Sequence, residues 1–158
     1  MVFKMNETSK IRDEVIQYCQ GCGFDLGCGD EKISKEAIGI DSGEEWDTSK
    51  NLSCVNIKEH MDDLMIFNSN SFDYAYSSHL LEHLKDPEKM ILEMCRVVKP
   101  GGHVVIYLPD KVLYTEDNTA HLNMWSLDDF IRILPENTEV VKSGLHSDYS
   151  FVVVFKVM

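Results

Sequence analysis

A glycine turn near the start of the chain has the residue types expected of a binding site for a nucleotide-like cofactor. Residues 23–26, predicted to form a strand, run into Gly27-Cys28-Gly29, where the two glycines lack Cβ atoms and let the backbone turn tightly and approach a ligand closely. Short glycine patterns also occur in ordinary strand-to-helix turns, so both interpretations stay open on this pattern alone. The turn is a candidate site whose support must come from the rest of the chain.

A carboxylate follows at the end of the next predicted strand. Residues 37–40 are predicted to form that strand, and Asp41 stands at its tip, 12 residues after Gly29. An acid in this position, beside a glycine turn, can accept hydrogen bonds from both hydroxyls of a ribose. The alternative is that Asp41 is a solvated loop acid.

Three histidines lie where they could take a proton from a bound acceptor. An imidazole titrates near neutral pH, which suits a general base, and His79 and His121 are the candidates for this catalytic role. His79 follows a predicted strand at residues 72–76, whereas His121 lies in a stretch without regular period. His83 could instead cap or pack on the start of a helix, and His121 could be an ordinary surface histidine.

The five cysteines, at positions 19, 22, 28, 54 and 95, do not form the pattern of a disulfide framework. Their number is odd and they are scattered through apolar stretches, as expected in a reducing compartment. Cys19-x-x-Cys22 could be half of a metal or redox site, but no second pair follows at ligand spacing. We therefore expect buried thiols and no metal site.

An alternation of helices and strands must position these residues, which predicts an α/β fold. The first helix is expected over residues 8–19 with Thr8 or Ser9 as its cap, and another begins at Pro87 after the cap Asp86. A further helix is expected after the cap Ser126. Strands are expected at residues 23–26, 37–40, 53–57, 72–76, 103–108, 139–143 and 149–157.

The connections between these elements carry further information. Residues 31–36 are polar and have room for one or two helical turns at most, which is less than a full crossover helix. Residues 44–52 are predicted to be loop, and residues 109–125 form a long irregular connection of the kind that is often functional. The two tail strands are close enough to form an antiparallel hairpin, so the sheet should be mostly parallel with an antiparallel edge.

Length and charge limit the kinds of partner. A chain of 158 residues should form a single domain, residues 1–158, and it contains no apolar run long enough to span a bilayer. Its 15 basic and 27 acidic residues give a formal charge of −12, which repels nucleic acid at long range. We expect a cytoplasmic protein that does not act on nucleic acid.

Five short motifs occur in the order and spacing of a known family. They lie at residues 24–29, 40–41, 71–73, 80–83 and 96–102. Together they resemble the successive motifs of class I S-adenosylmethionine-dependent methyltransferases, and the resemblance covers residues 20–110. A dinucleotide-binding dehydrogenase shares only the first two of these motifs.

The resemblance implies a doubly wound, mostly parallel seven-stranded sheet with an antiparallel C-terminal strand, and S-adenosylmethionine as the cofactor. It implies that Gly27 and Gly29 pass beneath the methionine and ribose parts of the cofactor, and that Asp41 takes the ribose hydroxyls. Asp25 would help to orient the amino group of the cofactor. The remaining residues that the resemblance implies around the cofactor are Cys28, Ser77 and either Asp62 or Asp63, the last for the adenine edge.

Two departures from the family pattern bear on activity. Asp30 follows Gly29, so the usual third glycine is missing, and the crossover at residues 31–36 is shorter than in most members. The resemblance implies methyl transfer to a small-molecule, sugar- or lipid-linked, or protein acceptor, and Ser77, Ser78 and His79 would face that acceptor. The alternative is a catalytically silent subunit that binds the cofactor or stabilises a partner. Oligomeric state is not indicated by the sequence.

Overall fold

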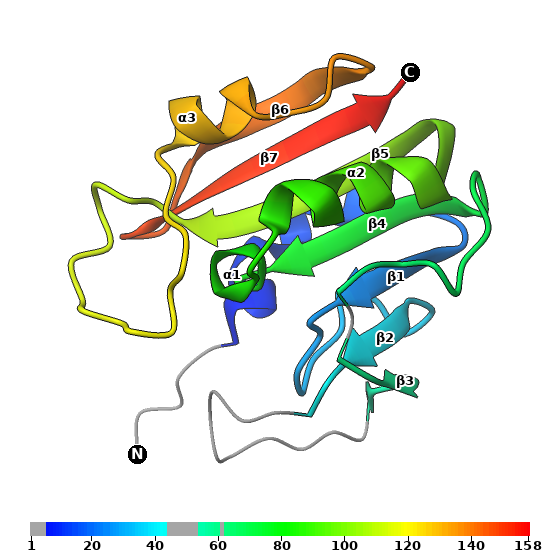
Figure 1. The fold of residues 1–158 in the computed structure, drawn as a ribbon, viewed down its shortest axis with the longest axis horizontal. Helices are drawn as coiled ribbons and strands as arrows, with labels where there is room; N and C mark the ends of the chain where they lie inside the picture. Colours follow the sequence, from blue (N-terminus) through cyan, green and yellow to red (C-terminus); the bar gives the residue numbers. More distant parts are fainter. Residues whose placement is uncertain (1–5, 44–53, 61) are drawn as a thin grey trace.

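In the computed structural model, which describes residues 6–43, 54–60 and 62–158, a seven-stranded sheet runs through the middle of the molecule (Figure 1). The strands lie in the order β3-β2-β1-β4-β5-β7-β6. Their bounds are β1 Gly23–Leu26, β2 Ile38–Asp41, β3 Ile57–Lys58, β4 Phe72–Ser78, β5 Val98–Pro109, β6 Thr138–His146 and β7 Ser150–Val157.

One strand, β7, runs against the others. It pairs antiparallel with both β5 and β6, whereas the pairs from β3 across to β5 are all parallel. The predicted doubly wound sheet with an antiparallel C-terminal strand is therefore confirmed. The predicted antiparallel hairpin is also observed, since β6 and β7 pair antiparallel at one edge of the sheet, with β7 inserted between β5 and β6. Nearly every residue of β7 is buried, as a strand covered on both faces requires.

Helices cover both faces of the sheet. On one face α1 (Glu7–Val15), followed by the 3₁₀ turn η1 (Ile16–Tyr18), packs on aromatic and valine side chains of β4, β5 and β7. On the other face lie α2 (Pro87–Val97), α3 (Leu127–Arg132) and the 3₁₀ turn η3 (Leu81–His83). Asp86 and Ser126 cap α2 and α3 as predicted, but the cap of α1 is Asn6, whose side chain accepts from Thr8 N.

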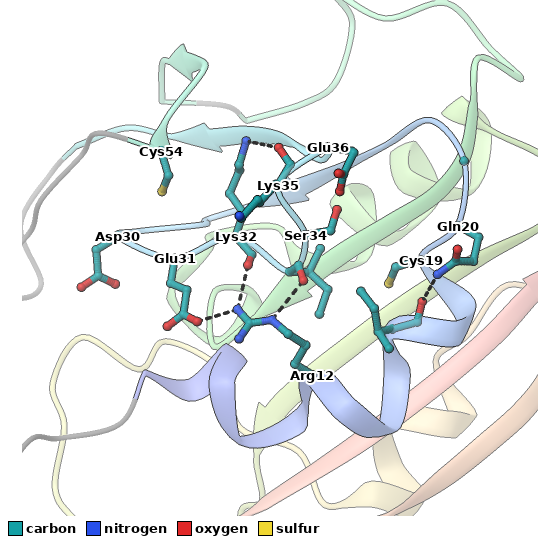
Figure 2. A pocket seen from close by; sticks show the side chains of 13 residues that line it. Arg12, Cys19, Gln20, Asp30, Glu31, Lys32, Ser34, Lys35, Glu36 and Cys54 are labelled. Atoms are coloured by element: carbon teal, nitrogen blue, oxygen red, sulfur yellow. Dashed lines mark hydrogen bonds and ion pairs between the residues drawn. The ribbon is translucent and has the colours of Figure 1, made fainter.

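The connection from β1 to β2 contains no helix in any of its residues, all of which the structure describes. Arg12 of α1 holds it instead, since its guanidinium donates to the carbonyls of Lys32 and Ile33 and lies 2.6 Å from Glu31 Oε1 (Figure 2). The predicted short crossover is thus observed. A salt bridge and two backbone contacts to α1 hold a segment that has no helical hydrogen bonds of its own.

The region around β3 differs from the prediction. A strand was expected at residues 53–57, but β3 has only two residues, Ile57–Lys58, and pairs with the end of β2. The loop expected at residues 44–52 lies outside the described residues. Among the helices that the structure describes, none has the length and apolar character needed to cross a membrane.

Candidate functional site

The glycine turn is hydrogen-bonded to the end of β2. Gly27 and Gly29 have φ of +74° and +57°, the left-handed region that glycine adopts most readily. The amides of Gly27 and Cys28 both donate to the Ile40 carbonyl, at 2.7 and 3.2 Å. The turn therefore has one defined conformation at the carboxyl ends of two adjacent parallel strands, where ligands bind in open α/β sheets.

Asp41 completes this arrangement. Its Oδ2 accepts from Gly29 N at 2.8 Å and its Oδ1 accepts from Gly43 N at 2.9 Å, and the side chain lies at the boundary of the buried region. A carboxylate has about four lone-pair positions, so each oxygen can still accept a further hydrogen bond. The structure brings together Asp41 and the turn glycines, as predicted.

The turn leaves room for a ligand on one side. A Cβ placed on Gly29 would have no atom of the described residues within 4 Å, whereas a Cβ on Gly27 would lie 3.1 Å from the Leu80 side chain. The backbone at Gly29 thus borders an open space, here called the cradle, that any larger side chain would fill. These residues fit a cofactor that lies against bare backbone and offers hydroxyls to Asp41.

Asp25 is buried beneath the crossover. Its side chain is 1% exposed, its Oδ2 accepts from Ile33 N at 2.6 Å, and burial raises the pKa of the carboxyl to about 8. Its Oδ1 has no hydrogen-bond partner among the described residues. In this structure Asp25 holds the crossover segment, and its contact with the amino group of a cofactor remains a prediction.

Two thiols approach the same carbonyl in the turn. Cys28 Sγ lies 3.8 Å and Cys54 Sγ lies 3.2 Å from Gly29 O. Burial is the main cause that raises the pKa of the Cys28 thiol far above its ordinary value, so it stays protonated. Cys28 therefore packs beneath the turn as a small neutral side chain.

The other residues expected around the cofactor are spread over three environments. Ser77 is buried, and its hydroxyl donates to the Leu26 carbonyl, which ties β4 to the end of β1. Asp62 is largely exposed, 3.4 Å from His60, and Asp63 forms an ion pair with Lys89 at 3.6 Å. No contact of the structure tests which of the two acids faces an adenine, so that assignment stays a prediction.

His79 is enclosed at the end of β4. Its Nε2 lies 3.1 Å from Ser150 Oγ and 3.6 Å from Glu7 Oε2, and its ring packs against Tyr107 and Tyr149. Burial lowers the pKa of the imidazole to about 4, although the nearby Glu7 carboxylate opposes this effect. His79 is thus neutral at pH 7, with a pKa well below the range that favours a general base.

A second group of titratable side chains lies beside His79. Glu82 is 1% exposed, its Oε1 lies 3.8 Å from His79 Nδ1 and 3.6 Å from His83 Nε2, and burial raises its pKa to about 8. The ring of His121 packs on that of His83 with 4.9 Å between centroids. Ligand atoms of Glu82, His83 and His121 all lie within 4.8 Å of one another, which is close enough for a metal ion.

The sequence places Glu82 and His83 in a family motif and includes His83 among the possible proton acceptors, but it does not predict that Glu82, His83 and His121 come together. The local signal was Glu82-His83 next to a predicted strand end, but the third member, His121, is 38 positions further along the chain. By contrast, the Cys19-x-x-Cys22 motif does not become a ligand cluster in the described part of the chain. Cys19 is buried, which raises its pKa to about 12, and Cys22 is exposed.

A hollow of about 730 Å³ lies on the α1 side of the short crossover (Figure 2). Arg12 and Ile16 line it from α1 and η1, and residues 30–36 line it from the crossover. It reaches Asp30 and Cys54, but neither the turn glycines nor Asp41 line it. The hollow reflects the missing crossover helix and is separate from the cradle at Gly29.

Comparisons with known proteins identify the family of this chain. A family model described as "Methyltransferase domain" matches residues 21–106. A ubiquinone biosynthesis O-methyltransferase from Vibrio parahaemolyticus is 31% identical over 129 residues, which is 73% of this chain and 53% of the relative. Two other curated relatives are covered over only 28% and 10% of their lengths, so the chain spans about half of its curated relatives or less.

Solved structures share the fold. The Haloferax volcanii methyltransferase that was solved with the methyltransferase activator Trm112 superposes with a TM-score of 0.71, at 14% identity, over 96% of this chain and 91% of that one. A SAM-dependent methyltransferase from Aquifex aeolicus gives a TM-score of 0.68 at 15% identity, over 95% and 93% of the two chains. At these identities the likeness concerns the fold alone.

Proposed function

Because this chain belongs to the family of class I S-adenosylmethionine-dependent methyltransferase domains, we propose that it transfers a methyl group to a small-molecule, sugar- or lipid-linked, or protein acceptor. The observation that carries the proposal is the junction of Gly29 and Asp41, where bare backbone and a carboxylate meet at the carboxyl ends of β1 and β2. This junction has the donors, acceptors and space that the cofactor requires.

Several residues would hold S-adenosylmethionine there. Gly27 and Gly29 would lie against its methionine and ribose parts, and the remaining lone pairs of Asp41 would accept the ribose hydroxyls. Asp25, Cys28, Ser77 and one of Asp62 and Asp63 complete the proposed set. When bound, the cofactor supplies a methyl group that its sulfonium has already activated, so the chain chiefly aligns the acceptor, which can contribute about 7 to 11 kcal/mol.

The acceptor would lie beside His79 and the loop of residues 110–125. The backbone amides of Leu122 and Asn123 donate to the Glu82 carbonyl, which holds this loop over η3. His79 and His121 are the proposed proton acceptors, should the acceptor need to lose a proton. With a pKa of about 4, His79 could serve only after rearrangement opens its environment, which makes the less deeply enclosed His121 the better placed of the two.

Calorimetric titration with S-adenosylmethionine, S-adenosylhomocysteine and NAD tests the cofactor directly. We expect the first two to bind and NAD to give no heat, because the two-glycine turn and Asp41 occur here with the later methyltransferase motifs. Binding of NAD alone would overturn the proposal. This titration can be carried out before the acceptor is identified.

A catalytically silent subunit is the second candidate. The third glycine of the family pattern is missing and the crossover contains no helix. A cofactor bound at the turn would therefore be more exposed to water than methyl transfer favours, since water has to be excluded from the reacting groups. The solved complex of the Haloferax neighbour with an activator supports a partner protein as one way to supply that cover. A stable complex with another protein, together with cofactor binding and no methyl transfer, would favour this candidate.

A further inference from the structure

We propose that Glu82, His83 and His121 form a binding site for a divalent transition-metal ion of the Zn²⁺ class. The site goes beyond the proposed function, because occupancy by an ion does not require that the chain transfer a methyl group. In a chain that holds the ion, His121 is a ligand and does not act as the proton acceptor. Its ligands come from η3 and from the loop of residues 110–125, which the fold brings together.

The first argument is the state of Glu82. Its side chain is 1% exposed, and neither carboxylate oxygen has a hydrogen-bond partner among the residues that the structure describes. Buried carboxylates are normally paired, hydrogen-bonded or bound to a metal, because an uncompensated buried charge is costly. A cation beside Oε1 would provide the missing compensation.

The second argument is the orientation of His83. Its Nδ1 lies 2.8 Å from the Ala120 carbonyl, which can only accept, so Nδ1 carries the ring proton. In the neutral ring the lone pair is then on Nε2, which lies 3.6 Å from Glu82 Oε1. A backbone carbonyl that orients a ligating histidine in this way is a recurrent feature of metal sites.

The third argument is the rigidity of the loop that carries His121. Leu122 N and Asn123 N donate to the Glu82 carbonyl at 2.8 and 3.1 Å, just after His121, and the carbonyl of Ala120, just before it, contacts His83. These bonds fix the backbone around His121 over η3. The backbone therefore places the three ligand residues next to one another, and only the His121 ring has to turn.

The distances suit an ion after a small adjustment. Zn²⁺ holds nitrogen and oxygen ligands at about 2.0 to 2.2 Å, which places the ligand atoms of a tetrahedral set about 3.4 Å apart. The Glu82–His83 pair is already at 3.6 Å, and all three ligand atoms lie within 4.8 Å of one another. Rotation of the His121 ring towards the other two would complete the set.

The donor set selects the class of ion. Two imidazoles and one carboxylate suit Zn²⁺ and neighbouring first-row metals, whereas Mg²⁺ and Ca²⁺ prefer ligand sets made of oxygen. Three protein ligands also leave a coordination position for an oxygen of a bound molecule, as in catalytic zinc sites. The site differs in this respect from the closed four-ligand sites that only stabilise folds.

Calorimetric titration of the tag-free, chelator-treated full chain with ZnCl₂ alone tests the site. We expect one ion per chain, and binding at least about tenfold weaker in Glu82→Gln and in His121→Gln. His60→Gln, which removes a histidine whose side chain is 59% exposed, should bind as the parent does. Circular dichroism checks that each variant is folded, and His121→Gln keeps the test open should Glu82→Gln fail to fold.

Titration with Co²⁺ identifies the ligands. Coordination by imidazole and carboxylate should give visible d–d absorption without the thiolate-to-metal charge-transfer bands that cysteine ligands produce. Absence of a stoichiometric site in the parent, or parent-like affinity in both Glu82→Gln and His121→Gln, would overturn the proposal. Thiolate charge-transfer bands would overturn it as well, because they would place the ion on the cysteines.

Discussion

The carboxylate of Asp41 accepts a hydrogen bond from the amide of Gly29, with 2.8 Å between Oδ2 and N. The acid that would bind the ribose therefore also holds the turn on which the rest of the cofactor would lie. Because Gly43 N bonds the other oxygen, the carboxylate is fixed before any ligand arrives. Such preorganisation lowers the entropy that binding would otherwise cost.

Replacing Asp41 by Ala should weaken binding of S-adenosylhomocysteine by on the order of 2 to 3 kcal/mol, or about 30- to 150-fold in Kd. The substitution removes the acceptor for the ribose and also releases Gly29. Asp148→Ala, in the exposed turn between β6 and β7, is the matched control and should leave the Kd unchanged. A folded Asp41→Ala variant with the parent's affinity would show that the ribose lies elsewhere.

Gly29→Leu should abolish cofactor binding by filling the cradle. The backbone cost of a leucine at positive φ, about 1 to 2 kcal/mol, is matched by Gly101→Leu. Gly101 has a φ of +86° and open space around its Cβ position, but it lies at the opposite end of the sheet. We expect both variants to lose similar stability in urea unfolding and only the first to lose affinity. Equal affinities would place the cofactor away from Gly29.

Stability should depend on pH through Asp25. Burial raises the pKa of its carboxyl to about 8, against the lowering effects of Arg12 and Lys32, and Asp41 adds to the rise. The native chain thus binds a proton that the unfolded chain releases near pH 4, so the free energy of unfolding falls as pH rises from about 4 to 8. The side chain of Asp25→Asn does not titrate, so the stability of that variant lacks this contribution to the pH dependence.

Urea unfolding of the parent and of Asp25→Asn at pH 5, 6 and 7 measures the effect. The parent should lose stability relative to the variant by up to about 1.4 kcal/mol per pH unit, which is the value for one proton. The comparison cancels contributions from other groups that titrate in both proteins. Parallel profiles would mean that Asp25 is ionised in the folded chain.

The loop of residues 110–125 should determine the turnover of the acceptor and not the affinity for the cofactor. Leu122, 58% exposed, belongs to this loop and its amide donates to the Glu82 carbonyl, whereas Leu145, 61% exposed, lies on the edge strand β6. Leu122→Asn should change acceptor turnover several-fold with an unchanged Kd for S-adenosylhomocysteine, and Leu145→Asn should change neither. Loss of cofactor affinity with unchanged turnover would remove the loop from the acceptor site.

The cofactor half of the site could be predicted because it depends on strand order alone. The carboxyl ends of adjacent parallel strands meet at one edge, so a turn after β1 and an acid at the tip of β2 must come together. The short crossover could also be predicted, since the six residues 31–36, five of them polar, are too few and too polar to form a full helix that packs on a sheet.

The acceptor half could not be predicted in the same way. The contacts of His79 with Glu7 and Ser150, and of Glu82 with His83 and its neighbours, depend on how α1 and a long loop pack over the sheet. The N-cap of α1 is Asn6 and not the predicted Thr8 or Ser9, because all three are good capping residues by type and the sequence does not distinguish them.

Incubation with methyl-labelled S-adenosylmethionine and a metabolite extract, followed by mass spectrometry, tests the central claim most directly. The parent and Gly101→Leu should both produce a labelled product, and Gly29→Leu should produce none, because only that variant blocks the cofactor cradle. Tight cofactor binding by the parent without a labelled product from any extract, and with a stable complex to another protein, would contradict methyl transfer by this chain.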